Sequence, residues 1–88
     1  IGVSNYTVAL IEEASRLSGD RLVCNQFEFH PYLDQSKVLA ACRAHGMAAV
    51  AYSPIAKGST KSDSVLTRIG QSYGKTGAQV SLRWLVQQ

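Results

Sequence analysis

Three short stretches of the chain carry amide and hydroxyl side chains that could bind a ligand: Ser4-Asn5, Asn25-Gln26 and Tyr52-Ser53. Asparagine and glutamine amides both donate and accept hydrogen bonds, which suits a neutral carboxamide on a ligand. The ring of Tyr52 offers a flat face on which a heteroaromatic ring could stack. Together these residue types favour a planar ligand that bears an amide.

Each of these side chains also has a purely structural interpretation. Ser4-Asn5 could cap a helix, Gln26 could satisfy buried backbone groups, and Tyr52 could be a core aromatic. The residue types alone leave both interpretations open.

The stretches lie at the ends of short apolar segments that alternate with helical patterns. Hydrophobic spacing, caps and glycine stops predict strands over 1–4, 22–27 and 47–52, and helices over about 7–17, from a cap at Asp34 to Gly46, and over about 63–73 and 78–86. Segment 47–52 is apolar without alternation, so we expect it to be covered on both faces. Residues 53–61 are expected to form a loop.

Strands that alternate with helices predict an α/β fold with a parallel sheet and right-handed crossovers. Ligands of such folds bind at the carboxyl ends of the strands, where the three polar stretches should meet. Three strands cannot close a barrel and would leave two exposed edges. We therefore expect the chain to be part of a longer polypeptide.

Composition excludes several function classes. The 88 residues carry nine Lys and Arg against six Asp and Glu, and the basic residues are scattered, which argues against a nucleic-acid partner. Cys24 and Cys42 lack metal-ligand spacing, so we predict no metal site and reduced, buried thiols in a cytoplasmic protein. No apolar stretch is long enough for a secretory signal or a membrane span, and no membrane partner is expected.

Four motifs, in order along nearly the whole chain, carry a family resemblance. Residues 1–6 resemble the aldo-keto reductase signature G-[LIV]-S-N-[FY], and residues 23–33 resemble V-N-Q-x-E-x-H-P-Y-L. Residues 51–55 are similar to A-Y-S-P-L, and residues 74–84 to G-K-T-x-A-Q-V-x-L-R-W. Within the family, the likeness is to prokaryotic diketogluconate and aldehyde reductases. It implies a partial (β/α)8 TIM barrel, with 1–88 a fragment of a single barrel domain that holds strands five to seven and an extra helix.

The resemblance also implies a cofactor, NADP(H), and residues that bind it. Ser4, Asn5 and Gln26 match the family's hydrogen-bond partners of the nicotinamide carboxamide, and Tyr52 matches the aromatic residue that stacks on the ring. The loop that follows lies along the pyrophosphate in the family, which makes Ser53 and Ile55 expected contacts. Lys57, Gly58 and Ser59 of the same loop are further candidates. The family's catalytic Tyr, Lys, Asp and His precede this segment, so it carries no catalytic residue.

The implied function is hydride transfer from NADP(H) to small aldehydes or ketones. On its own the chain is expected to be inactive, because it needs the rest of the barrel. The alternative is a non-catalytic regulatory subunit of the same fold, although such relatives usually depart from the N-Q-x-E-x-H-P-Y-L motif kept here.

The remaining histidines and tyrosines are not expected to take part in catalysis. His30 is expected to be structural, and His45 to be an exposed group at a helix end. Tyr6, Tyr32 and Tyr73 are expected to be packing or surface residues.

Overall fold

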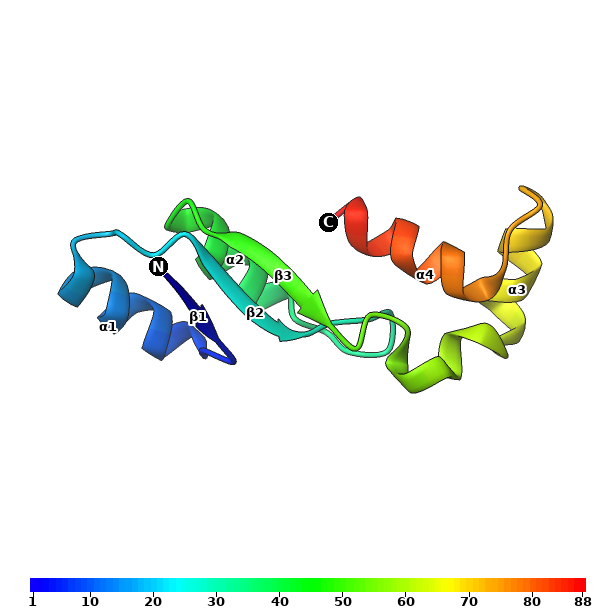
Figure 1. Ribbon diagram of the computed structural model, residues 1–88, viewed down its shortest axis with the longest axis horizontal. Coiled ribbons are helices and arrows are strands. Elements are labelled where there is room, and N and C mark those ends of the chain that lie inside the picture. Colours follow the sequence, from blue (N-terminus) through cyan, green and yellow to red (C-terminus); the bar gives the residue numbers. More distant parts are fainter. The chain divides into compact units, whose positions relative to one another are not determined.

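The computed structural model describes residues 1–88 and contains three strands, one 3-10 segment and four α-helices (Figure 1). In chain order these are β1 (Gly2–Ser4), α1 (Val8–Ser18), β2 (Cys24–Glu28), α2 (Ser36–Ala44), β3 (Ala48–Tyr52), η1 (Ala56–Lys61), α3 (Ser64–Gln71) and α4 (Gly77–Val86). The predicted order of strands and helices is confirmed. The expected loop after β3 instead forms 3-10 turns, which are interrupted where Lys57 and Gly58 take positive φ.

The chain divides into two compact units. The first unit contains Ile1–Glu28 and Asp34–Tyr52, and the second contains Phe29–Leu33 and Ser53–Gln88. All three strands belong to the first unit, and α3 and α4 belong to the second.

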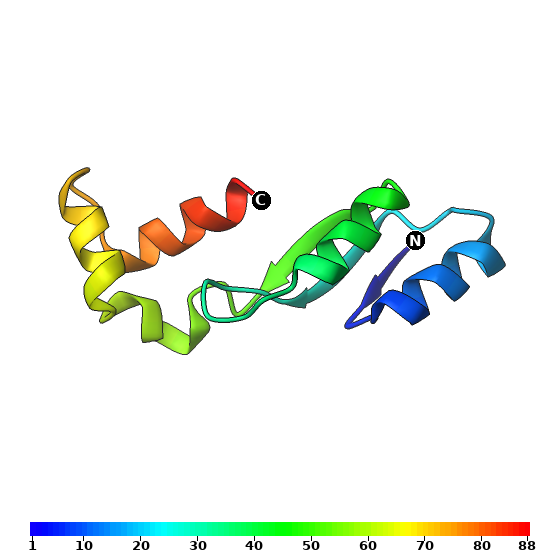
Figure 2. The same cartoon turned by 180° about the vertical axis from the view of Figure 1, so that it is seen from behind.

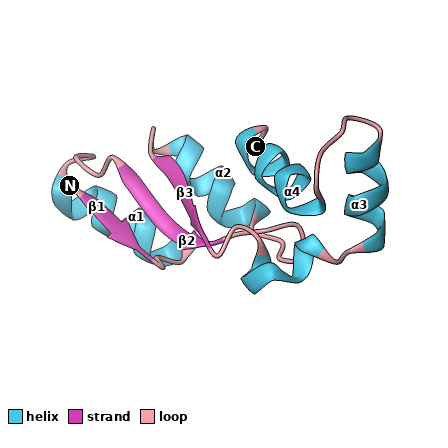
Figure 3. Ribbon diagram, turned by 45° about the vertical axis from the view of Figure 1, so that its right-hand side comes forward, coloured by secondary structure: helices cyan, strands magenta, loops and turns pink.

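The first unit is a three-stranded sheet in the order β1-β2-β3, with both pairs parallel as predicted. Helices α1 and α2 pack against each other behind the strands (Figure 3), and α2 comes to the front when the chain is seen from behind (Figure 2). Successive crossovers of the same hand between neighbouring parallel strands place their helices on the same side of the sheet. The sheet therefore has a helix-covered face and an open face.

Strand alternation assigns the side chains to these two faces. The helix-covered face carries Asn25 and Phe27, which are 0% and 4% exposed. The open face carries Ser4, Gln26 and Tyr52, all exposed. The hydrophobic core of this unit lies between the helix-covered face and the helices, and includes Ile11, Leu22, Leu39, Ala41, Cys42 and Met47.

The prediction that segment 47–52 is covered on both faces is wrong for this structure. Ala48, Ala49, Val50 and Tyr52 of β3 are exposed. The reason is that β3 is an edge strand and both helices of the first unit lie on one face of the sheet. An apolar sequence without alternation therefore indicates that the strand is suited to burial, and the cover itself has to come from elsewhere.

Helix starts follow the expected caps with one difference. Thr7 caps α1 by accepting from the Leu10 amide at 3.4 Å, and Thr76 forms a capping box with Gln79 at the start of α4. Asp34 was expected to cap α2, but it accepts from the Ser36 amide at 2.9 Å and Gln35 holds the cap position. None of the helices is long and apolar enough to cross a membrane.

The second unit is held by aromatic and polar contacts among its helices and loops. The Phe29 ring packs edge-on against Trp84, with 5.1 Å between ring centroids. The Tyr32 hydroxyl donates to Oδ2 of Asp63 at 2.7 Å, while Oδ1 of the same carboxylate caps α3. The buried Ser81 hydroxyl donates to the Pro54 carbonyl at 2.8 Å, which ties α4 to the chain before η1.

Candidate functional site

The open face of the sheet brings together the polar side chains that end its strands. Ser4 lies beside Gln26 in the register of β1 and β2, and Gln26 lies beside Val50 of β3. Tyr52 is two residues further along β3 and, by alternation, points to the same face as Val50. The carboxyl edge of the open face therefore carries hydroxyl, amide and aromatic groups from all three strands.

A chain of hydrogen bonds joins these residues. The Tyr52 hydroxyl donates to Oδ1 of Asn5 at 2.8 Å, and Nδ2 of Asn5 lies 3.3 Å from Oγ of Ser4, to which it donates. The Ser4 hydroxyl in turn donates to the Gln26 carbonyl at 3.1 Å. The sequence predicted that these four residues share one end of the fold, and the structure places three of their side chains in direct contact.

The turn after β1 has a strained backbone that needs support. Asn5 has a φ of 59°, in the left-handed region that asparagine tolerates better than most residues. The backbone amide of Asn5 donates to the Gln26 backbone carbonyl at 2.8 Å, the same oxygen that accepts from the Ser4 hydroxyl. The backbone of β2 thus fixes where Ser4 and Asn5 lie.

Asn25, considered above together with Gln26 as a ligand-binding stretch, instead supports this arrangement from the helix-covered face. Its side chain, 0% exposed, accepts from the Tyr6 amide at 3.3 Å and donates to the Tyr6 carbonyl at 3.2 Å. The available signal was the Asn25-Gln26 dipeptide itself, because adjacent strand residues point to opposite faces and only one of the two amides can face a ligand. Burial raises the pKa of the Cys42 thiol, and a hydrogen bond with Asn25 partly offsets that rise.

The electrostatic character of the cluster is neutral. Ser4, Asn5, Gln26 and Tyr52 provide hydroxyl and amide groups, each of which can donate and accept, together with one aromatic ring. Glu28, beside Tyr52 in the register, is the charged residue of β2 on this face. No group of three or more His, Cys, Asp or Glu side chains among residues 1–88 is placed to hold a metal ion.

Ser53 and Ile55 belong to the second unit and follow β3 directly in the sequence. Ser53 has a φ of 48°, and its carbonyl accepts from the Ala56 amide at 3.0 Å. The Ile55 carbonyl accepts from the Gly58 amide at 3.0 Å and from the Thr60 hydroxyl at 3.2 Å. Their carbonyls thus organise the turns of η1.

The two histidines lie elsewhere. His30 accepts from the Tyr32 amide through Nδ1 at 3.3 Å, and its ring tilts against the Tyr32 ring, consistent with the structural role expected for it.

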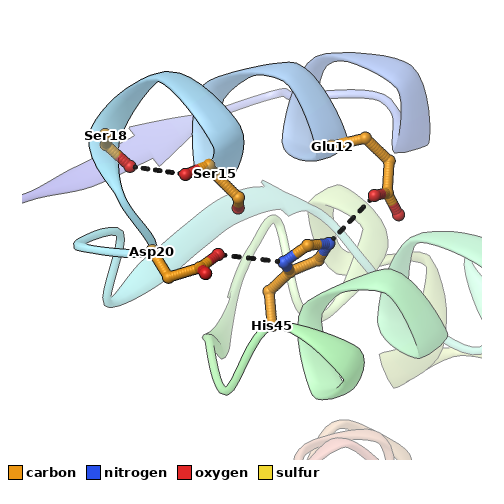
Figure 4. A network of polar contacts seen from close by, with 5 residues as sticks. All are labelled: Glu12, Ser15, Ser18, Asp20 and His45. Carbon is orange, nitrogen blue, oxygen red and sulfur yellow. Dashed lines mark hydrogen bonds and ion pairs between the residues drawn. The ribbon is translucent and has the colours of Figure 1, made fainter.

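His45 is less exposed than the sequence predicted, because its side chain is only 20% exposed. Its Nε2 lies 3.1 Å from Glu12 and its Nδ1 lies 3.4 Å from Asp20 (Figure 4). The helical spacing could not reveal a contact between the end of α2 and residues of α1 and the following turn.

The sequence profile of the aldo/keto reductase family matches residues 1–88, the full chain. The chain belongs to the aldo/keto reductase family. It is 39% identical over 85 residues to methylglyoxal reductase DkgB of Salmonella typhimurium, covering 96% of this chain and 32% of that protein. It is also 39% identical over 87 residues to glyoxal reductase of Bacillus subtilis, covering 99% of this chain and 32% of the relative.

A solved aldo-keto reductase structure agrees with this assignment. The crystal structure of a candidate 2,5-diketo-D-gluconic acid reductase B is 52% identical and superimposes with a TM-score of 0.97. The match covers 100% of this chain and 31% of that one. The chain therefore spans about a third of the length of the relatives it matches.

Proposed function

We propose that this chain forms the nicotinamide-binding wall of an NADP(H)-dependent aldo-keto reductase that reduces small aldehydes or ketones to alcohols. The relatives named as methylglyoxal and glyoxal reductases support the substrate class. The chain corresponds to about a third of such a protein, so the activity is proposed for the complete protein that carries these residues. The 88 residues alone are expected not to turn over.

The single observation that carries the proposal is the linked cluster on the open face. Ser4, Asn5 and Tyr52 are joined by hydrogen bonds, and Gln26 lies beside Ser4 in the register. The nicotinamide carboxamide is neutral and planar and has one acceptor and two donor hydrogens, so a cluster of hydroxyls and amides is chemically suited to it. The residues present therefore fit this end of the cofactor.

Each residue has a distinct role in the proposal. Ser4, Asn5 and Gln26 hold the carboxamide. Tyr52, which is 38% exposed, packs its ring against the nicotinamide ring. When bound, the cofactor supplies a hydride to the carbonyl carbon of the substrate. The bond from Tyr52 to Asn5 fixes the orientation of the aromatic ring, so that stacking and carboxamide binding are set by one hydrogen-bonded group. Ser53 and Ile55 are proposed to continue the site along the pyrophosphate.

The proposal is tested by the affinity of the complete protein for NADP(H) after Tyr52→Ala. Loss of a stacking aromatic weakens base binding by about 1–3 kcal/mol, so the dissociation constant should rise about 5- to 150-fold. Tyr52→Phe keeps the ring and loses the bond to Asn5, which should cost about 0.5–1.5 kcal/mol. Tyr73→Ala is the matched control, because Tyr73 is 75% exposed and is not among the proposed cofactor contacts.

Two results would speak against this assignment. An unchanged dissociation constant for Tyr52→Ala would remove the stacking role. Tight cofactor binding by the complete protein with no reduction of any aldehyde or ketone would favour the regulatory-subunit alternative over the enzyme.

A further inference from the structure

The buried amide of Asn25 lies directly beneath the turn that carries Ser4 and Asn5. Two of its hydrogen bonds go to Tyr6, the residue after Asn5, one to the backbone amide and one to the backbone carbonyl. A further bond joins it to the Cys42 thiol. A carboxamide is the side-chain group that can meet a backbone N–H and C=O at once, because it presents one acceptor and one donor side by side. At 0% exposure, no bulk water can replace either bond.

The turn depends on being held from β2. Asn5 takes a left-handed φ of 59°, and its amide bonds the Gln26 carbonyl at 2.8 Å. The bonds from Asn25 fix the next residue, Tyr6, at 3.3 and 3.2 Å. Adjacent residues of one strand thus hold the two ends of the turn, and the left-handed residue lies between Ser4 and the clamp on Tyr6.

We propose that Asn25 is a positioning residue for nicotinamide binding: it faces away from the ligand and holds the Ser4-Asn5 turn in its binding geometry by clamping the Tyr6 backbone. This inference rests on the proposed function. The chemistry of the position is specific. An aspartate would keep the acceptor for the Tyr6 amide and lose the donor to the Tyr6 carbonyl, and an apolar residue would lose both.

The test compares Asn25→Asp and Asn25→Ala in the complete protein by the dissociation constants of NADPH and of adenosine 2′,5′-bisphosphate, which lacks the nicotinamide. Both variants should weaken NADPH about tenfold or more, as for loss of one buried hydrogen-bond partner, and leave the adenosine probe unchanged. For Asn25→Asp, NADPH affinity should recover as the pH falls through the pKa of the new carboxyl, because its protonated form can again donate to the Tyr6 carbonyl.

A stability control separates positioning from general loosening of the fold. Leu39→Ala removes a core side chain of α2 that is 8% exposed and should lower the melting temperature without changing NADPH affinity. If Leu39→Ala weakens NADPH as much as Asn25→Asp does, or if both Asn25 variants weaken the adenosine probe equally, the positioning role is overturned.

Two further measurements keep the inference decidable. Should the Asn25 variants not fold, hydrogen exchange of the Tyr6 amide in the unaltered protein decides it: slow exchange supports the clamp, and exchange at the rate of an exposed amide overturns it. Gln26→Ala tests the proposed function on which the inference rests. If Gln26→Ala weakens NADPH and the Asn25 variants do not, only the inference fails; if neither weakens NADPH, both fail.

Discussion

Asn25 and Gln26 are neighbours in the chain and differ completely in environment. Asn25 lies on the helix-covered face, is 0% exposed and bonds backbone groups, whereas Gln26 lies on the open face and is exposed. The same residue chemistry therefore serves two purposes, because side chains alternate between the faces of a strand. The helix-covered face thus holds the fold and the turn in place, while the open face exposes the groups that we propose bind a ligand.

The largest difference between the two faces should appear when one apolar residue on each face is truncated. Phe27→Ala, on the helix-covered face, removes a side chain that is 4% exposed and should lower the free energy of unfolding by about 3–5 kcal/mol. Val50→Ala, on the open face, removes a smaller side chain that is 37% exposed within residues 1–88 and should cost less than Phe27→Ala. Denaturant unfolding of the complete protein measures both, and equal losses would contradict the division into two faces.

Gln26→Leu should show the opposite balance, a change in binding with little change in stability. The leucine would stay on the open face, so the free energy of unfolding should change by no more than about 0.5 kcal/mol. Losing the amide should weaken NADP(H) by about 1–1.5 kcal/mol, or about 5- to 12-fold. Calorimetric titration alongside denaturant unfolding gives both values. A large loss of stability would place Gln26 with the supporting residues instead.

Ser15 lies within the helix layer and lacks a partner for its side chain. Its hydroxyl, on α1, is buried with no hydrogen-bond partner, and the residue is 1% exposed. Ser15→Ala removes an unsatisfied polar group and improves helix propensity, so stability should rise by about 0.5–2 kcal/mol. Thermal melting detects the gain. A loss of stability would mean that this hydroxyl is satisfied in solution.

The smallest expected effect is a pH dependence confined to the helix layer. The hydrogen bond to Glu12 raises the pKa of His45 above its ordinary value of 6.5; desolvation opposes the rise, and Asp20 adds to it. A raised folded-state pKa means that the contribution to stability is fully present below pH 6.5 and is lost as pH rises through the folded-state pKa. The melting temperature should therefore fall slightly across that window, and Glu12→Gln should flatten the fall. An equal slope in Glu12→Gln would exclude this bond as the cause.

Much of the fold followed from local patterns in the sequence. The order of strands and helices, the parallel sheet and the caps at Thr7 and Thr76 were predicted, because apolar spacing and capping chemistry act over a few residues. The exposure of β3 was not predicted, because it depends on which elements pack against the strand and not on the strand's own residues. The placement of the strands as five to seven of a barrel stays a prediction.

The residues of the candidate site could be predicted from the sequence, but the hydrogen bonds between them could not. Ser4, Asn5, Gln26 and Tyr52 were named from strand ends and motifs, and their role toward a cofactor stays a prediction. The bond from Tyr52 to Asn5 links residues 47 positions apart, and the clamp of Asn25 on Tyr6 spans 19. Such contacts depend on register and on a left-handed turn, which a residue pattern does not specify.

The most direct test of the account is a crystal structure of the complete protein with bound NADP⁺. We expect the carboxamide within hydrogen-bond distance of the Ser4, Asn5 and Gln26 side chains. The nicotinamide ring should stack on Tyr52, and Asn25 should remain bonded to the Tyr6 backbone. A nicotinamide bound away from the open face of the sheet would contradict it.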